Sequence, residues 1–451
     1  MHSLTGNRDQ VLQLMNNTIQ NMESGGPQAG AAGIGAESDA DISVVADLRM
    51  GFMEAQVEGA TAAGLGATEE EEAGWYVPRN RQVAVFQSMM DEYLAEQNAP
   101  EVPKGGGGAG AAAIGEEDVS HAEIAADVFY QGAAGPGAGG AAAAALMEQF
   151  SNLDPRWVSW VWIKAQGWLK GKHAFVNHTS LNDFQFDMKD EATVAIVGDW
   201  GGGNAAAQAV AKQINAIKPD HVIHLGDVYY SGTPKETQER FIKYWPRPSE
   251  PGRSLALNSN HEMYGGGYGY FDITLPAFKQ PASYFSLSNQ KWRFIALDTG
   301  YDEHDLHGQQ DEWLAAQLQD GGRKNILLSH HQLFSAYENT DASKLYTKVK
   351  RFLDAKQIYG WIWGHEHLCV AYQEYMGIKA VCLGNGCFPY NPPRNQPQVP
   401  VEWLNDRAQA DDPDYRGMHT FALLKVSPAQ VDITYIDEDG HEAHTQKWNW
   451  Q

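Results

Sequence analysis

The second half of the chain alternates short apolar runs with stretches in which apolar residues repeat at helical spacing. The apolar runs predict strands, and the stretches between them predict helices. The predicted strands are Thr193–Val197, His221–Leu225, Ser254–Leu257, Trp292–Leu297, Asn325–Leu328 and Tyr359–Trp363, and the predicted helices are Ala205–Ile217, Lys235–Tyr244, Gln309–Leu318 and Tyr346–Ala355. Continuously apolar strands are typical of sheets buried on both faces, so the pattern indicates an α/β layered domain.

The last part of the chain has a different pattern. Ile378–Leu383, Thr420–Val426 and Val431–Ile436 have strand-like composition with few helical stretches between them. We therefore expect either one mixed sheet or a second sheet packed on the first.

The first 150 residues differ from both of these regions. Gly- and Ala-rich tracts separate stretches of helix-like composition, and such tracts bury little surface when ordered. The tracts are Gly25–Ala36, Gly105–Gly115 and Gly132–Ala145, and the helix-like stretches lie near Asp41–Ala60, Arg81–Gln97 and Glu117–Tyr130. We predict a partly flexible helical extension over residues 1–150, a Trp-rich entry segment over 151–190 and the main domain over 191–451.

Charge separates the same regions. The 451-residue chain has a formal net charge of -24, and residues 1–150 hold 22 acidic and 5 basic side chains, which leaves 35 and 28 for the remainder. An excess of negative charge disfavours general affinity for nucleic acid. The acidic extension is instead expected to act as a solubilising segment or to dock a protein partner.

Targeting and redox features are sparse. No apolar run reaches the length of a membrane-spanning helix, and the first twenty residues lack the basic and apolar regions of a secretory signal. Three cysteines are too few for a disulfide framework, and none forms a CxxC pair. We therefore expect a cytoplasmic protein with reduced thiols.

Five predicted strands end directly in polar loops rich in metal-ligand residue types. These loops are Gly198-Asp199-Trp200-Gly201, Gly226-Asp227-Val228-Tyr229-Tyr230, Asn258-Ser259-Asn260-His261-Glu262, Ser329-His330-His331 and Gly364-His365-Glu366-His367. The carboxyl ends of strands gather at one edge of an α/β sheet, where ligand sites form. Each loop alone is weak evidence, but together they predict a shared cavity lined by Asp, Asn, His and Tyr side chains.

The series GDWG, GDVYY, SNHE, SHH and GHEH resembles the five motifs of the calcineurin-like metallophosphoesterases, and among them the purple acid phosphatase branch. The resemblance covers about residues 192–386. It implies an α/β (α+β) fold of two packed mixed β-sheets flanked by helices. It also implies a binuclear metal-dependent phosphoric ester hydrolase, in which metal-activated water attacks phosphorus in a small phosphate ester, most simply a phosphomonoester.

Carried over by position, the resemblance implies seven metal ligands and one catalytic histidine. The first metal would be held by Asp199, Asp227, Tyr230 and His367, the second by Asp227, Asn260, His330 and His365, and His261 would lie beside the bound phosphate. A phenolate is a hard anionic donor, so Fe(III) suits the tyrosine site, with Fe, Zn or Mn in the other.

The sequence departs from the family pattern at three points. Gly201 stands where many members have a ligand histidine, and Tyr230, three residues after Asp227, would replace that ligand as it does in the purple branch. Tyr229 adjoins Tyr230, so the tyrosine could be displaced by one residue. Ser259 stands where the family usually has Gly, which Ser can replace if its φ is negative.

Other residues near these motifs have less definite roles. Glu262 is a candidate for orienting a histidine ring or an ordinary surface acid of the loop, and Asp298 is expected to be structural. His331 and Gln332 could line the pocket, and His304 and His307 could touch substrate from a loop.

Three other functions are considered. Metal ligands alone do not fix the type of ester, so a phosphodiesterase acting on nucleotides or lipid head groups is the main rival. A Ser/Thr protein phosphatase is disfavoured, because Tyr-Tyr-Ser-Gly replaces the arginine expected shortly after Asp227. A docking or effector protein that uses residues 1–150 is an alternative of another class.

Overall fold

The computed structural model describes residues 8–23, 48–55, 80–97, 171–302, 304–319, 321–338, 342–388, 390, 392–408 and 417–450. The chain divides into two compact units, residues 1–169 and residues 170–451. Each unit is considered by itself.

The described residues of the first unit form two long helices, α1 (Arg8–Glu23) and α3 (Arg81–Gln97), and a short helical stretch over residues 48–55. α3 coincides with the predicted helix, and its Val83, Phe86 and Met89 are buried at helical spacing. Asn80 caps this helix, because its Oδ1 accepts hydrogen bonds from the backbone N–H groups of residues 82 and 83. The sequence analysis did not anticipate α1. The expected helix at 117–130, the Gly/Ala tracts and residues 151–170 lie outside the described residues.

The second unit consists of two packed mixed β-sheets flanked by helices, which confirms the predicted fold class. The eight-stranded sheet has the order β1-β5-β6-β7-β8-β10-β9-β11 and the six-stranded sheet the order β14-β13-β12-β2-β3-β4. The strands are β1 (Gln185–Asp187), β2 (Ala192–Val197), β3 (His221–His224), β4 (Arg253–Ala256), β5 (Phe285–Ser288), β6 (Trp292–Ala296), β7 (Lys324–Ser329), β8 (Gly360–Trp363), β9 (Cys369–Tyr372), β10 (Lys379–Leu383), β11 (Val401–Leu404), β12 (Thr420–Val426), β13 (Gln430–Asp437) and β14 (Glu442–Asn449).

Parallel pairing lies at the centre of each sheet, and antiparallel strands extend it. β2, β3 and β4 are parallel, and β12, β13 and β14 continue their sheet as an antiparallel meander. β6, β7, β8 and β10 are parallel in the other sheet, where β9 and β11 run antiparallel. The two open possibilities for the last strands are thus both realised: β10 joins a mixed sheet, whereas β12 and β13 belong to the second sheet.

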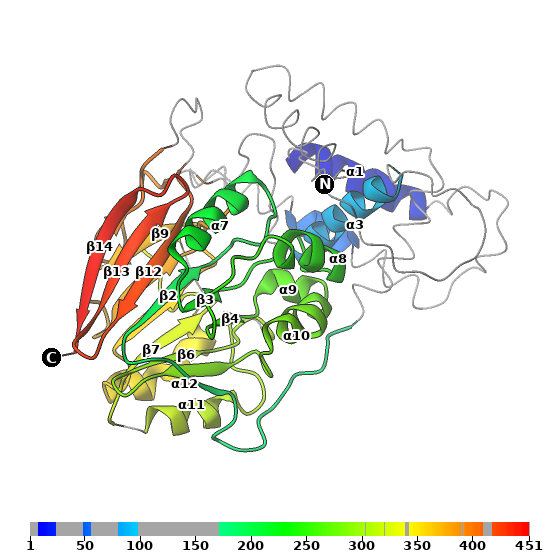
Figure 1. Ribbon diagram of the computed structural model, residues 1–451. Helices are drawn as coiled ribbons and strands as arrows, with labels where there is room; N and C mark the ends of the chain where they lie inside the picture. Colours follow the sequence, from blue (N-terminus) through cyan, green and yellow to red (C-terminus); the bar gives the residue numbers. More distant parts are fainter. Residues whose placement is uncertain are drawn as a thin grey trace, which may run out of the picture. The chain divides into compact units, whose positions relative to one another are not determined.

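Eight helical segments lie between these strands in the described part of the second unit. They are α7 (Ala205–Ile217), α8 (Pro234–Glu236), the π-helical segment η2 (Thr237–Ile242), α9 (Asn260–Tyr264), the π-helical segment η3 (Tyr270–Thr274), α10 (Leu275–Phe278), α11 (Gln310–Leu318) and α12 (Ser343–Asp354), with α8 and η2 continuous. α7 has the predicted bounds, whereas the helix expected over 235–244 is mostly π-helical. In Figure 1, α7 covers the outer side of the six-stranded sheet, and α11 and α12 lie along the eight-stranded sheet.

The main core lies between the two sheets. Alternate residues of one strand point to opposite faces, so Ile326 and Leu328 of β7 pack against the other sheet. Leu327 points the opposite way and packs with Trp313 of α11 and Val349 of α12. Central strands therefore bury both faces, which explains their continuously apolar sequences.

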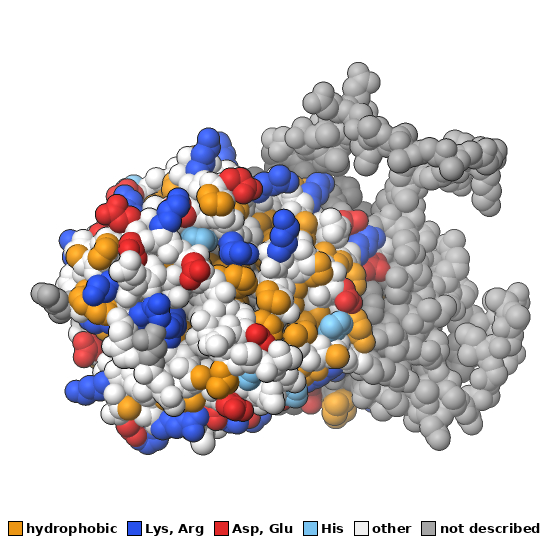
Figure 2. Space-filling model, turned by 60° about the horizontal axis from the view of Figure 1, so that its bottom comes forward, with side chains coloured by type: hydrophobic (Ala, Val, Ile, Leu, Met, Phe, Trp, Pro, Cys, Tyr) orange, Lys and Arg blue, Asp and Glu red, His pale blue; other side chains and the backbone are white. Residues whose placement is uncertain are grey.

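Charge is mixed on the surface of this unit. Figure 2 shows basic and acidic side chains interspersed over the described part of the face in view. Among the described residues, no helix combines the length and the apolar character needed to cross a bilayer.

The two sheets approach each other closely at Gly360 of β8. A Cβ atom at this position would lie 2.5 Å from Cζ3 of Trp448 on β14, and the Trp448 ring is buried. Contacts this short cannot be relieved without moving the indole or the strand. Gly360 therefore sets how closely the edge of the sandwich closes.

We expect Gly360→Ala to lower the free energy of unfolding by about 1–3 kcal/mol, because it overpacks this contact. Denaturant unfolding followed by tryptophan fluorescence measures the change. Gly321→Ala is the matched control, since a Cβ there would meet no atom within 4 Å. Equal stability of the two variants would contradict the close-packing interpretation.

Candidate metal centre

The five polar loops converge at the carboxyl ends of parallel strands. Three follow β2, β3 and β4 in the six-stranded sheet, and two follow β7 and β8 in the eight-stranded sheet. Because the sheets face each other, loops more than 160 residues apart in sequence meet: the backbone N–H of His365 donates to Asp199 Oδ2 at 2.9 Å. The expected convergence of these loops is therefore present in the structure.

The first group of side chains comprises Asp199, Asp227, His367 and a tyrosine. His367 Nε2 lies 3.4 Å from Asp199 Oδ1. One ligand atom from each of the two carboxylates and from His367 lies within 4.8 Å of the others, which is the spacing of a candidate metal site. All three side chains are buried, with exposed fractions of 4% or less.

The tyrosine whose hydroxyl lies in this group is Tyr229, whereas the sequence analysis expected its neighbour Tyr230. The Tyr229 hydroxyl oxygen lies 3.3 Å from Asp199 Oδ1, 3.2 Å from Asp227 Oδ2 and 3.0 Å from His367 Nε2. The Tyr230 ring instead has the Arg240 guanidinium above it, 5.3 Å from the ring centroid. The spacing from Asp227 favours Tyr230, but in the conformation of this loop the Tyr229 side chain points toward the two carboxylates.

The second group comprises Asp227, Asn260, His330 and His365, the four residues expected around the second metal. His330 Nε2 is at its centre: it lies 3.2 Å from Asp227 Oδ1, 2.9 Å from Asn260 Oδ1 and 3.1 Å from His365 Nδ1. The other ring nitrogen, Nδ1, is 2.9 Å from the carbonyl oxygen of Leu225. A carbonyl only accepts, so Nδ1 carries the proton and Nε2 presents a lone pair to the group.

The backbone at these loops is held in an uncommon conformation. Asp199, Asp227, His365 and His367 all have positive φ, at 55°, 76°, 69° and 50° respectively. Left-handed backbone costs free energy in residues with a Cβ and concentrates at functional sites. Glycine allows the loops to approach: a Cβ at Gly364 would lie 2.6 Å from Asp199 Oδ2.

Burial shapes the electrostatics of the carboxylates. Burial, with the charge of Asp227 as the next contribution, raises the pKa of Asp199 well above its usual value. Burial also acts to raise the pKa of Asp227, but His330 and His261 outweigh it, so this pKa is lowered. Two carboxylates this close cannot both be charged in an apolar interior without a compensating cation. Together with the nitrogen and phenol donors, this arrangement fits bound metal ions.

His261 lies at the edge of the first group, with Nε2 3.9 Å from Asp227 Oδ2. Its Nδ1 hydrogen-bonds the carbonyl oxygen of Tyr230, so Nδ1 donates and Nε2 faces the carboxylates. Burial lowers the pKa of His261, and Asp227 only partly offsets this. The backbone carbonyl of Tyr230 thus fixes the orientation of the His261 ring.

Ser259 and Glu262 support Asp227 rather than a histidine ring. Ser259 has φ −136°, so it fits without strain where the family usually has Gly. Its hydroxyl hydrogen-bonds both Asp227 Oδ1 and Glu262 Oε2. Glu262 Oε2 also accepts from the backbone N–H of Asp227 at 3.2 Å. Burial, then repulsion by Asp227, raises the pKa of Glu262 to about 8. Glu262 is therefore a buried acid behind Asp227, and its suggested contact with a histidine ring is replaced by these contacts.

Asp298 has the structural role expected of it. It accepts from the Asn258 side chain at 3.1 Å and from the backbone N–H groups of Gly300 and Tyr301 at 3.0 and 2.9 Å. Asn258 lies two residues before Asn260, so Asp298 holds the base of the third polar loop. It fixes the loop without being one of the converging ligands.

The loop histidines differ from each other. His304 packs its ring against His331, with centroids 4.2 Å apart, and lies 6.2 Å from the His365 ring centroid. His307 instead pairs through Nδ1 with Asp302. Both histidines were suggested as substrate contacts. Among these contacts, His304 lies next to the converging loops, whereas His307 contacts Asp302 of its own loop.

Two aromatic residues next to the groups were not singled out from the sequence. The Phe388 ring packs edge-on against Tyr229 at 3.9 Å between centroids. The Tyr264 hydroxyl accepts from Asn260 Nδ2 at 2.9 Å, which turns Asn260 Oδ1 toward His330. The position of Tyr264, one helical turn after Asn260 on α9, is a local signal that could have identified it.

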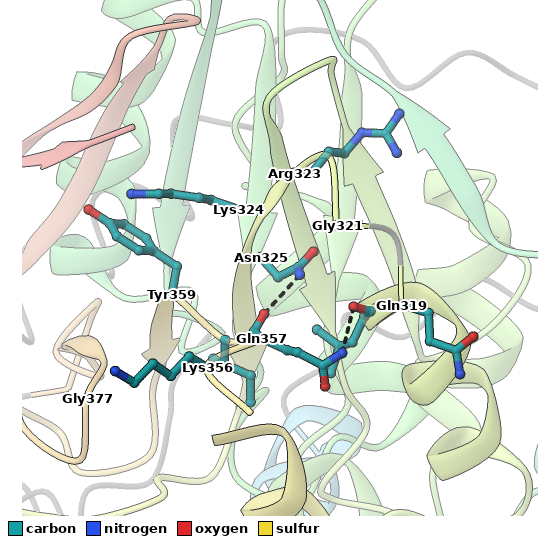
Figure 3. A pocket seen from close by; sticks show the side chains of 11 residues that line it. Gln319, Gly321, Arg323, Lys324, Asn325, Lys356, Gln357, Tyr359 and Gly377 are labelled. Atoms are coloured by element: carbon teal, nitrogen blue, oxygen red, sulfur yellow. Dashed lines mark hydrogen bonds between the residues drawn. The ribbon is translucent and has the colours of Figure 1, made fainter. Parts of the chain in front are cut away.

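A separate cavity of about 340 Å³ lies at the opposite ends of β7 and β8 (Figure 3). Arg323, Lys324 and Tyr359 line it, but the cations are directed elsewhere: Arg323 Nε donates to Asn289 O, and Lys324 Nζ donates to Asn449 O. In Figure 3, Arg323 is directed away from Lys324, whose Nζ lies 3.9 Å from the Tyr359 ring centroid. This cavity is unrelated to the polar loops.

Residues 192–369 match the family model described as calcineurin-like phosphoesterase. The match begins at the first residue of β2 and ends at the first residue of β9, so it spans all five converging loops. This part of the chain is therefore similar to the calcineurin-like phosphoesterases, and the match supports a metal-dependent phosphoesterase of the hydrolase class.

The curated relatives that match this chain are acid phosphatases. Tartrate-resistant acid phosphatase type 5 from Sus scrofa is 24% identical over 285 residues, covering 54% of this chain and 83% of that protein. The Homo sapiens protein of the same name is 24% identical over 300 residues, covering 56% and 90%. This distant homology supports the resemblance to the purple acid phosphatases.

Solved structures include similar folds. GAP50, titled the anchor in the inner membrane complex of Plasmodium, has a TM-score of 0.45 at 13% identity, covering 58% of this chain and 89% of that one. A dimetal phosphatase from Danio rerio has a TM-score of 0.39 at 13% identity, covering 58% and 100%.

We expect Tyr264→Phe to weaken binding of the second metal ion about 10- to 100-fold, because Asn260 loses the partner that orients its amide. Titration of the metal-depleted protein with Zn²⁺ measures the affinity. Tyr268→Phe is the control, since it removes a hydroxyl from a more exposed tyrosine of the following loop. Unchanged affinity in Tyr264→Phe would show that Asn260 is oriented by other contacts.

Proposed function

We propose that this domain is a binuclear metal-dependent phosphomonoesterase. The observation that carries the proposal is the sharing of one carboxylate, Asp227, by two adjacent groups of metal-ligand side chains. A bridging carboxylate places two cations close enough to act on one phosphoryl group. The homology to acid phosphatases favours a monoester as substrate.

The first cation is assigned to Asp199, Asp227, Tyr229 and His367. Three hard oxygen ligands and one imidazole suit Fe(III), provided that Tyr229 binds as the phenolate. The second cation is assigned to Asp227, Asn260, His330 and His365, a set of two oxygen and two nitrogen ligands. This set suits divalent Zn, Mn or Fe.

When bound, such a pair supplies Lewis acidity and an activated water that attacks phosphorus. The protein's own contribution is positional. His261 donates its Nδ1 proton to the Tyr230 carbonyl, so the proton that it can exchange with a substrate is the one on Nε2. In the imidazolium form it can protonate a leaving alkoxide. Because burial lowers the pKa of His261, this form increases at acidic pH.

We expect the purified protein to hydrolyse phosphomonoesters with kcat/KM at least about tenfold above that for diesters, equivalent to ~1.4 kcal/mol. A panel of aryl and alkyl monoesters, diesters and nucleotides tests this. Asn260→Ala should lose turnover on every substrate, because the second ligand group is then incomplete. His261→Asn should lose about 100-fold or more on alkyl monoesters and less on aryl monoesters, whose leaving groups need no proton.

Faster hydrolysis of diesters would replace the monoesterase with the rival phosphodiesterase and leave the metal centre intact. Full activity in Asn260→Ala would contradict the assigned second ligand group. The docking role suggested for residues 1–150 stays a prediction, because most of that region lies outside the described residues. The cytoplasmic location likewise stays a prediction.

We expect iron-loaded protein to show the visible tyrosinate–Fe(III) absorption that the purple branch implies. Tyr229→Phe should abolish the band, because this hydroxyl faces both carboxylates. Tyr230→Phe is the matched control and should keep it. A band lost only in Tyr230→Phe would restore the assignment made from spacing, and colourless active protein holding zinc or manganese would contradict the iron assignment.

A further inference from the structure

Three histidines form a further cluster beside the second ligand group. His304, His331 and His365 each present a ring nitrogen, and these nitrogens lie within 4.8 Å of one another. His304 and His331 are outside the two ligand groups assigned above. The cluster joins the loop after β6 to the loops after β7 and β8, so it is assembled by the fold rather than by neighbouring sequence.

His331 is built like a metal ligand. The side chain is 1% exposed, and its Nδ1 lies 2.9 Å from the Thr299 hydroxyl oxygen. Its Nε2 is buried and has no hydrogen-bond partner. Leaving a buried polar nitrogen unsatisfied costs free energy, which binding to a ligand would recover. His330 is held in a related way, with Nδ1 bonded to a carbonyl oxygen and Nε2 directed into a ligand group. Ligation through His331 Nε2 requires its proton to be on Nδ1, from which the Thr299 hydroxyl oxygen can accept.

The other two rings complete the cluster. His365 Nδ1 lies 3.1 Å from His330 Nε2 in the second group, so we assign the other ring nitrogen, Nε2, to this cluster. The ring centroids of His304, His331 and His365 are separated by 4.2, 4.7 and 6.2 Å. Ligation of three imidazoles by one tetrahedral ion at the usual ~2.1 Å would give about 5 Å between centroids, so small ring movements suffice.

We propose that His304, His331 and His365 bind a third metal ion, a divalent cation such as Zn²⁺ that prefers imidazole ligands. Three neutral imidazoles with one open position form a recurrent zinc site. The proposal rests on the proposed function in one respect, because His365 is shared with the second metal. Binding by both of its nitrogens requires the His365 ring to release its N–H proton to solvent.

This third ion would extend the metal pair toward the substrate. Its open position could take a phosphate oxygen or an oxygen of the leaving group, as a cation near developing negative charge does. His304 would then be a metal ligand rather than a direct substrate contact. The backbone N–H of His304 donates to the Thr299 carbonyl at 2.9 Å, so one residue, Thr299, holds both His304 and His331 in place.

The test is the number of Zn²⁺ ions bound per folded chain. Metal-depleted protein is loaded with Zn²⁺, excess is removed by gel filtration, and the bound ions are counted by mass spectrometry of the metal. We expect three ions in the wild type and two in His304→Asn. Asparagine tolerates the positive φ of His304, which is 66°, better than most residues do.

His307→Asn is the matched control and should keep three ions, because His307 belongs to the same loop but pairs with Asp302. His331→Gln is a second test and should also bind two. Two ions in the wild type, or three in His304→Asn, would overturn the third site. If inorganic phosphate binds more weakly to His304→Asn while the wild type holds two ions, the cluster binds the substrate anion instead. Fewer than two ions in the wild type would contradict the proposed function as well.

Discussion

Two buried carboxylates, Asp199 and Asp227, impose the strongest physical constraint on this molecule. Side chains of like charge in an apolar interior repel each other and lose their hydration, so the surroundings must compensate. The surrounding groups meet this need: two histidines lower the pKa of Asp227, and the Tyr229 hydroxyl lies between both carboxylates. Bringing these groups together requires left-handed backbone at the strand ends, which costs free energy, and glycines where the loops approach too closely for a Cβ.

Much of this arrangement could be predicted from the sequence. Apolar strands ending in Asp, Asn and His identify the converging loops, because strand direction fixes which ends share an edge. The choice between Tyr229 and Tyr230 could not be made in this way, because spacing along the chain does not tell which way a side chain points. The role of Glu262 escaped for a similar reason: its partners, Ser259 and the backbone of Asp227, become visible only once two loops are placed side by side.

Elements of the fold were missed for different physical reasons. β14 alternates exposed and partly buried residues, with Trp448 its buried anchor, so it lacks the apolar run that identifies central strands. The region expected as one helix over residues 235–244 becomes largely π-helical, which a periodicity of 3.6 residues cannot distinguish. α1 was missed although Val11, Met15 and Ile19 recur at helical spacing and are buried, so the signal was present in the sequence.

The sandwich divides its ligand atoms unevenly between its two layers. Carboxylate, amide and phenol oxygens follow β2, β3 and β4, whereas the imidazole nitrogens of His330, His365 and His367 follow β7 and β8. Cations that require both kinds of donor would therefore be bound by both sheets at once and would link them. Loss of the ions would then weaken the contact between the two sheets as well as abolish activity. The free energy of unfolding of the domain would therefore depend on the concentration of free metal.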